Sequence, residues 1–144
     1  MKPEVAHSRA TVTVRVTEEM TAVLDGRLIH PVYSTYWLAY HSEVAARRAI
    51  ESFFDPGENA VGGELYLKHL AMAAVGDQVT ITATVTEVRL PVIKCRIEAV
   101  SRSRKIAEGF QTQIVLPQER IDQLIREAQH LAAHPPAAVP KASE

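Results

Sequence analysis

The spacing of apolar residues changes twice along the chain, from alternation to helical periodicity and back again. Residues 9–16 alternate between apolar and polar side chains, which predicts a half-buried strand. Between Ser34 and Phe54 apolar side chains recur every three or four positions, which predicts one long helix. Pro56 ends this helix, because proline lacks the amide donor and disfavours helical geometry in the residue before it.

Four strands are predicted to follow the helix in an unbroken run. Their ranges are 60–69, 78–88, 92–101 and 106–116. The second of them is the clearest, because apolar residues alternate with threonines from Val79 to Thr86. Pro117, a favourable residue for a first helical turn, then starts an amphipathic helix. Its apolar stripe consists of Ile121, Leu124, Ile125, Ala128 and Leu131.

A run of strands segregated from one long helix indicates an α+β fold and not a parallel βαβ arrangement. A helix of about 20 residues is roughly 30 Å long, close to the width of a small sheet that curves around it. We therefore expect a hotdog fold, in which a long central helix is wrapped by a curved antiparallel sheet, plus a C-terminal amphipathic helix. Residues 1–133 are expected to form this single domain, and the Pro/Ala-rich residues 134–144 to be disordered.

The open strand edges of the predicted sheet favour self-association. An antiparallel sheet leaves strand edges open, and joining two sheets edge to edge covers them, so a homodimer or a dimer of dimers is expected.

Composition and charge narrow the range of other partners. The 16 Lys and Arg residues balance 17 Asp and Glu residues, which gives no indication of nucleic-acid binding. The sequence contains neither an apolar stretch long enough to cross a membrane nor a signal-peptide pattern, and a cytoplasmic protein is therefore expected.

Cys95 is the only cysteine, so no intrachain disulfide can form. It alternates with Ile93 and Ile97 on one face of a predicted strand, which favours a small buried side chain over a reactive thiol. The six histidines and this cysteine show none of the spacings typical of metal ligands, so no metal site is expected.

Three polar side chains in apolar surroundings are candidates for chemistry. Glu43 borders the apolar stripe of the long helix, although it could also form an exposed ion pair with Arg47. His69 lies on the apolar face of its strand, either as a hydrogen-bonded core residue or as the acid/base partner of a carboxylate. Thr35 stands at the helix entrance, where it or Ser34 could cap the helix.

Three segments carry a resemblance to a known family: residues 33–43, Asp55–Glu58 and Tyr66–Ala71. Together they resemble the fluoroacetyl-coenzyme A thioesterases and related hotdog thioesterases over roughly residues 32–116. In that family a threonine precedes the catalytic glutamate by eight residues and a histidine follows it by twenty-six, and Thr35, Glu43 and His69 reproduce both spacings. The resemblance implies a Thr/Glu/His triad that hydrolyses an acyl-CoA thioester to a free acid and CoA. No cofactor is implied, since CoA is part of the substrate.

The resemblance also implies a role for Gly62 and Gly63, because the family has an active-site glycine at the position of Gly62. Without a Cβ, this backbone could approach the thioester closely, and we expect the pair to bind substrate. The alternative is that the two glycines mark a strand bulge.

Two departures argue against a fluoroacetyl group as the substrate. The segment before the threonine, residues 17–31, is shorter than the family's apolar lid, and Gln113 stands where the family has an arginine. The bulky side chains of Tyr33, Tyr36 and Trp37 near the expected pocket favour a short acyl group.

Helix geometry restricts how the triad can assemble. Eight residues of regular helix separate Thr35 from Glu43 by about 12 Å along the axis. Either Thr35 lies on a non-helical segment that folds back, or a second subunit completes the site.

Two other functions stay open. One is a hotdog enoyl-thioester hydratase, although such enzymes usually place an aspartate and a histidine a few residues apart. The other is a non-catalytic acyl-CoA-binding dimer.

Overall fold

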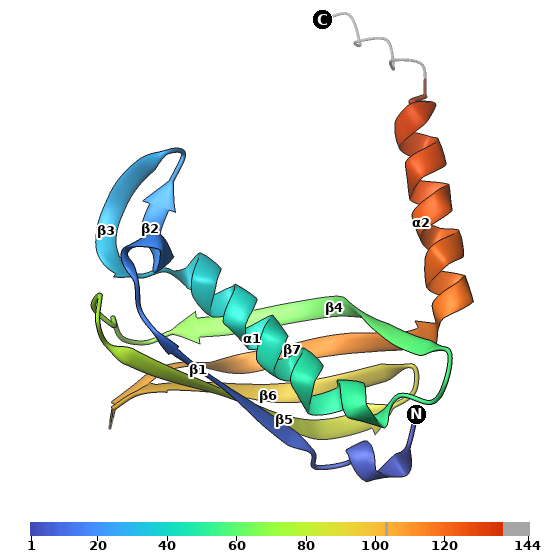
Figure 1. Cartoon of the computed structure of the whole chain (residues 1–144), viewed down its shortest axis with the longest axis horizontal. Helices are drawn as coiled ribbons and strands as arrows, with labels where there is room; N and C mark the ends of the chain where they lie inside the picture. The colour runs from blue at the N-terminus through green and yellow to red at the C-terminus, as the bar shows by residue number, and fades with distance from the viewer. Residues whose placement is uncertain (103, 137–144) are drawn as a thin grey trace, which may run out of the picture.

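The computed structural model describes residues 1–102 and 104–136. Its main sheet has five antiparallel strands in the order β1-β5-β6-β7-β4, and helix α1 packs against one face of it (Figure 1). The strands are β1 (Arg9–Arg15), β4 (Glu58–His69), β5 (Gln78–Arg89), β6 (Val92–Ser101) and β7 (Arg104–Pro117). The other elements are a β2 (Thr21–Leu24) and β3 (Arg27–Tyr33) hairpin, α1 (Thr35–Ile50), α2 (Gln118–Ala133), and 3₁₀ turns at Pro3–Val5, Glu18–Met20 and Glu51–Phe53.

This architecture confirms the predicted α+β hotdog fold. Helix α2 ends at Ala133, where the predicted tail begins. The prediction of disorder for residues 134–144 falls mostly on residues 137–144, which lie outside the described residues.

The core fills the space between α1 and the concave face of the sheet. Helix α1 contributes Leu38 and Ile50 together with alanines, whose small side chains let the helix lie close to the strands. The sheet contributes fully buried residues from its central strands, among them Ile81, Ile93 and Ile97. Cys95 is buried among them as predicted, and burial raises the pKa of its thiol to about 11.

The ends of α1 are set by side chains outside the helix. Ser34 is the N-cap, and its hydroxyl accepts a hydrogen bond from the backbone amide of Trp37 at 3.1 Å. At the other end the helix stops at Ile50 and not at the predicted Phe54, and a 3₁₀ turn follows. The Ser8 hydroxyl donates to the carbonyl of Ala49 at 2.7 Å. A residue far away in the sequence therefore satisfies a carbonyl that a longer helix would have bonded with its own backbone amide.

The β2–β3 hairpin was not among the predicted elements. Asp25 and Gly26 both have positive φ, 51° and 71°, as two-residue hairpin turns require. The flanking strands escaped prediction because β2 has only four residues, the register shifts twice, and Pro31 interrupts the strand pattern of β3. The backbone amide of Tyr33 donates to Ala73 at 2.8 Å, which anchors the hairpin beside the segment that follows β4.

Strand β4 is an edge strand, and within the described chain it pairs only with β7. The middle of β4, residues 61–66, is exposed and includes the apolar side chains of Val61, Leu65 and Tyr66. An open edge with exposed apolar side chains favours pairing with a further strand. Gly63 is an extra residue in the ladder and forms a bulge, which confirms one of the two interpretations of the glycine pair.

Candidate active site

Thr35 and His69 are in contact where the start of α1 lies beside the end of β4. Thr35 is the first residue of α1 and His69 the last of β4, and the Thr35 Oγ1 lies 2.9 Å from His69 Nδ1. The pair lines a cavity of about 320 Å³ formed with the hairpin and residues 70–72. His69 Nε2 is buried and has no hydrogen-bond partner among the described residues. Burial lowers the pKa of His69, so its imidazole is neutral near pH 7.

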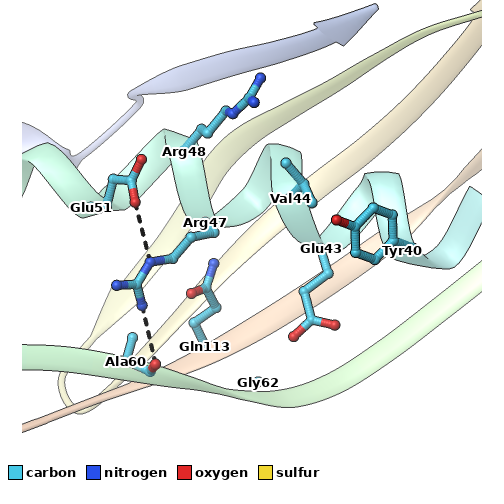
Figure 2. Close-up of a pocket in the computed structure, with 9 residues that line it drawn as sticks. All are labelled: Tyr40, Glu43, Val44, Arg47, Arg48, Glu51, Ala60, Gly62 and Gln113. Carbon is cyan, nitrogen blue, oxygen red and sulfur yellow. Dashed lines mark hydrogen bonds and ion pairs between the residues drawn. The ribbon is translucent and has the colours of Figure 1, made fainter. Parts of the chain in front are cut away.

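Glu43 lies apart from this pair, further along α1. Its side chain points from the helix toward β4 at Gly62 (Figure 2). A Cβ added to Gly62 would lie 2.8 Å from Glu43 Oε1, so the absence of a side chain there makes room for the carboxylate. Because α1 is regular from Thr35 onward, the hypothesis of a non-helical segment that folds Thr35 back is wrong. Within one chain, Thr35 and His69 come together and Glu43 does not join them.

Arg47 is not the ion-pair partner of Glu43. Its guanidinium donates to Asn59 Oδ1 at 2.7 Å and to the carbonyl of Ala60 at 3.1 Å, and it lies 3.4 Å from Glu51 (Figure 2). These contacts fasten α1 to the start of β4. Glu43 forms no ion pair within residues 1–102 and 104–136, and its carboxylate faces a cavity of about 380 Å³.

Two glutamines that sequence reasoning did not assign to the site line this region. Gln111 and Gln113, on β7, are almost fully buried, and Gln111 Oε1 and Gln113 Nε2 have no hydrogen-bond partner in the part of the chain that is described. Gln113 borders the cavity beside Glu43 (Figure 2), and Gln111 Nε2 lies 3.6 Å from the position of a Gly62 Cβ. Two buried amides on alternate positions of a core strand are a sequence signal that could have identified them.

A buried pair at the base of α1 also escaped the sequence analysis. The Tyr33 hydroxyl lies 2.7 Å from His41 Nδ1, and both side chains are buried. Burial raises the pKa of Tyr33 and lowers that of His41, so the pair is neutral. This hydrogen bond ties the end of β3 to α1 and thereby holds Thr35 at the helix entrance.

On the catalytic role that the family resemblance implies for Glu43, Gly62→Ala is expected to lower turnover about 10-fold, because the new methyl group displaces the Glu43 carboxylate from its position. The φ of Gly62 is outside the left-handed region, so alanine fits the backbone and the melting temperature should change little. Steady-state kinetics and thermal denaturation measure the two quantities. Unchanged turnover would show that the carboxylate does not need this space.

The described residues contain no group of three His, Cys, Asp or Glu side chains that could hold a metal ion. No helix in the same residues is long and apolar enough to cross a membrane.

One solved structure places this chain in the hotdog thioesterase superfamily, and a second shares its fold. A hypothetical protein of Thermus thermophilus, described as a thioesterase superfamily member, is 30% identical with a TM-score of 0.89, covering 92% of this chain and 98% of its own. A hot-dog-like protein of Thermanaerovibrio acidaminovorans is 20% identical, with a TM-score of 0.80, and the match covers 87% and 94% of the two chains.

The match to a family model is more specific than the match to the superfamily. The family described as FlK, the fluoroacetyl-CoA-specific thioesterase, matches residues 16–119, and this chain belongs to that family. The structure of the fluoroacetyl-CoA thioesterase FlK is 23% identical with a TM-score of 0.76, covering 85% of this chain and 95% of its own. A comparison with curated proteins by sequence found no match.

Proposed function

We propose that this protein hydrolyses a short acyl-CoA thioester to the free acid and CoA, as a homodimer whose two active sites each contain Thr35, Glu43 and His69. The observation that carries the proposal is the division of these residues within one chain. Thr35 and His69 are hydrogen-bonded, His69 Nε2 is buried without a partner, and Glu43 points at the exposed middle of the same strand that ends in His69.

Pairing of two β4 edges around a twofold axis brings these residues together. An antiparallel ladder related by a twofold axis centres on one residue, and a ladder centred on Tyr66 sets Gly63, the neighbour of Gly62, opposite the partner's His69. Because Glu43 lies against Gly62, its carboxylate then approaches the free Nε2 of that imidazole. Each site takes Thr35 and His69 from one subunit and Glu43 from the other, and the symmetry axis generates both sites.

In the proposed arrangement each group has one role. In the tautomer with the proton on Nε2, the Thr35 hydroxyl donates to His69 Nδ1, and Nε2 can donate to the Glu43 carboxylate. Glu43 then either attacks the thioester carbonyl or removes a proton from the attacking water. By the water route, a carbon–oxygen bond to the water oxygen forms, the carbon–sulfur bond breaks, and the CoA thiolate takes up the proton that Glu43 removed from the water. By direct attack, the carbon–sulfur bond breaks as an anhydride with Glu43 forms, the CoA thiolate takes up a proton from solvent, and water then hydrolyses the anhydride to the free acid and restores Glu43.

Structures of relatives support a small acyl group. Structures of FlK, 22% identical to this chain, include a variant in complex with acetyl-CoA and another in complex with fluoroacetate and CoA. The cavities beside Glu43 and beside Thr35 and His69 measure about 380 and 320 Å³. The unpaired amides of Gln111 and Gln113 offer hydrogen bonds to a carbonyl or a water in the Glu43 cavity.

Thiol release from a series of acyl-CoA thioesters tests this function. The series runs from acetyl to palmitoyl and includes fluoroacetyl and phenylacetyl thioesters, with Glu43→Gln as the matched inactive control. Release is expected from the short acyl thioesters and not from the palmitoyl thioester. If the folded, dimeric protein releases thiol from none of them, the thioesterase proposal is wrong and a hydratase or a binding protein takes its place.

A further inference from the structure

Two glutamines of β7 are buried with one end of each amide group unpaired. Gln111 and Gln113 are 2% and 3% exposed. Gln111 Oε1, a hydrogen-bond acceptor, and Gln113 Nε2, a donor, have no partner among the described residues. A buried polar atom without a partner destabilises the folded chain. Two of them on one strand indicate that they bind a group which the chain itself does not provide.

Both glutamines lie on the face of the sheet that faces the Glu43 carboxylate. Residues two apart in a strand point to the same face, and Gln113 is the cross-strand partner of Gly62, against which Glu43 lies. Gln113 lines the cavity of about 380 Å³ beside Glu43 (Figure 2), and Gln111 lines a neighbouring cavity of about 210 Å³ with Glu43 and Gly62. The two cavities therefore share the carboxylate that the proposed function places at the thioester.

The unpaired atoms define the chemistry of a group that fits them. Gln111 Oε1 needs a donor and Gln113 Nε2 needs an acceptor, and among small substituents a hydroxyl supplies both. The last torsion of a glutamine side chain is broad, so each amide can turn toward the cavity to meet this hydroxyl. A methyl group of similar size would leave both atoms unpaired.

The charges around the cavity argue against an anionic substituent. Glu43 forms no ion pair in the part of the chain that is described, and the guanidinium of Arg47 is already bound to Asn59. Arg48, the other cation that lines the cavity, is exposed and points away from Glu43 (Figure 2). A carboxylate on the acyl group would therefore meet the negative charge of Glu43 without a cation beside it. A neutral hydroxyl avoids this repulsion.

Depth decides which end of the substrate reaches the glutamines. Both side chains are almost fully buried, whereas the phosphates of CoA are charged and have to remain in water. The acyl group is the part of the thioester that is small enough to be enclosed. With the reacting carbonyl at Glu43, the carbon next to the carbonyl is the one whose substituent can reach the two amides.

We propose that Gln111 and Gln113 form a subsite that selects a short α-hydroxyacyl group, whose hydroxyl accepts from Gln113 Nε2 and donates to Gln111 Oε1. The proposal rests on the thioesterase activity of the proposed function and names the class of its substrate. Glycolyl-CoA, the thioester of hydroxyacetic acid, is the smallest member of this class.

A comparison of glycolyl-CoA with propionyl-CoA tests the subsite, because the two acyl groups differ only by a hydroxyl in place of a methyl group. A site built to bind a substrate hydroxyl rejects the analogue without it, since its buried polar groups then stay unpaired. The kcat/KM of the wild-type protein is expected to be about 100-fold higher for glycolyl-CoA. Each value is first divided by the alkaline hydrolysis rate of the same thioester, which removes the difference in intrinsic reactivity.

Gln113→Met and Gln111→Met replace each amide by an apolar side chain of similar size. Each is expected to lower kcat/KM for glycolyl-CoA about 10-fold and to raise it for propionyl-CoA. The melting temperature should not fall, because the unpaired atom makes no hydrogen bond that the substitution could remove. Thr112→Val is the matched control. Thr112 lies between the two glutamines but points to the other face of the sheet and binds Glu64, so this variant should keep the wild-type preference.

The outcomes separate the subsite from the activity on which it rests. Thiol release from both thioesters with a ratio near one overturns the subsite and leaves the thioesterase function intact. A preference for glycolyl-CoA that persists in both methionine variants also overturns the subsite, because the selecting groups then lie elsewhere. Thiol release from none of the short acyl thioesters overturns the proposed function and the subsite together.

Discussion

Glu43→Gln and His69→Ala are each expected to lower acyl-CoA hydrolysis about 100-fold or more, because in the proposed mechanism each removes a group that positions or transfers a proton at the reacting carbonyl. Neither side chain is part of the apolar core, so both variants should fold. The rate constants come from thiol release at saturating substrate. Near-normal turnover in both variants would remove these residues from the mechanism.

Mixing the two inactive variants gives a result that only a shared site predicts. In a heterodimer of a Glu43→Gln chain and a His69→Ala chain, one site has the intact His69 of the first chain and the intact Glu43 of the second. The other site has both defects. Random exchange of subunits makes half of the dimers mixed, so the mixture should regain about a quarter of wild-type activity.

The matched control is a mixture of Thr35→Ala and His69→Ala chains. Thr35 and His69 of one chain belong to the same site, so each site of this heterodimer has one defect and activity should not return. Recovery in the control but not in the first mixture would show that Glu43 acts with the Thr35 and His69 of its own chain.

Gly109→Ala is expected to have the largest effect on stability. Gly109 lies on β7, opposite Leu67 of β4 and Ile97 of β6, and a Cβ there would overlap the carbonyl oxygen of Tyr66. Backbone cannot move aside as a flexible side chain can, so β4 must shift away from β7. We expect the free energy of unfolding to fall by about 3 kcal/mol. For a chain of this length the melting temperature then drops by roughly 10 °C.

Thermal and urea denaturation measure this effect, with Glu108→Ala as the neighbouring control. Glu108 forms only an exposed ion pair with Lys105, and its loss should change stability by less than about 0.5 kcal/mol. Gly109→Ala should also lower activity, because β4 carries both Gly62 and His69. Equal stability of the two variants would contradict the close approach of β7 to β4.

Several parts of the fold followed from local pattern. Alternation of apolar and polar residues identified β1 and β5 to β7, and the spacing of apolar residues identified α1 and α2. Buried strands and amphipathic helices leave these patterns because each side chain faces either core or solvent. The β2–β3 strands left no such pattern, since most of the hairpin projects into solvent and packs little of itself on the core.

The candidate site was predictable as a set of residues and not as a geometry. Spacing and the family resemblance selected Thr35, Glu43 and His69, whereas Gln111 and His41 received no role. Gln113 was noted only in place of the family's arginine, and Tyr33 only as a bulky side chain near the expected pocket. Polar residues in a core strand look alike in sequence whether they face a cavity or a neighbouring side chain. Their unpaired amide atoms become apparent only when β7 is placed under α1.

The sequence by itself determined the α+β class, the elements around the core and the family, because these depend on periodicity and on a few matched spacings. Only the tertiary structure decided that Thr35 contacts His69, that Arg47 binds Asn59 and Ala60 instead of Glu43, and that Glu43 lies against Gly62. Such contacts join residues far apart in the chain. Their distances depend on how α1 crosses the sheet and on the register of β4, and no local pattern encodes either.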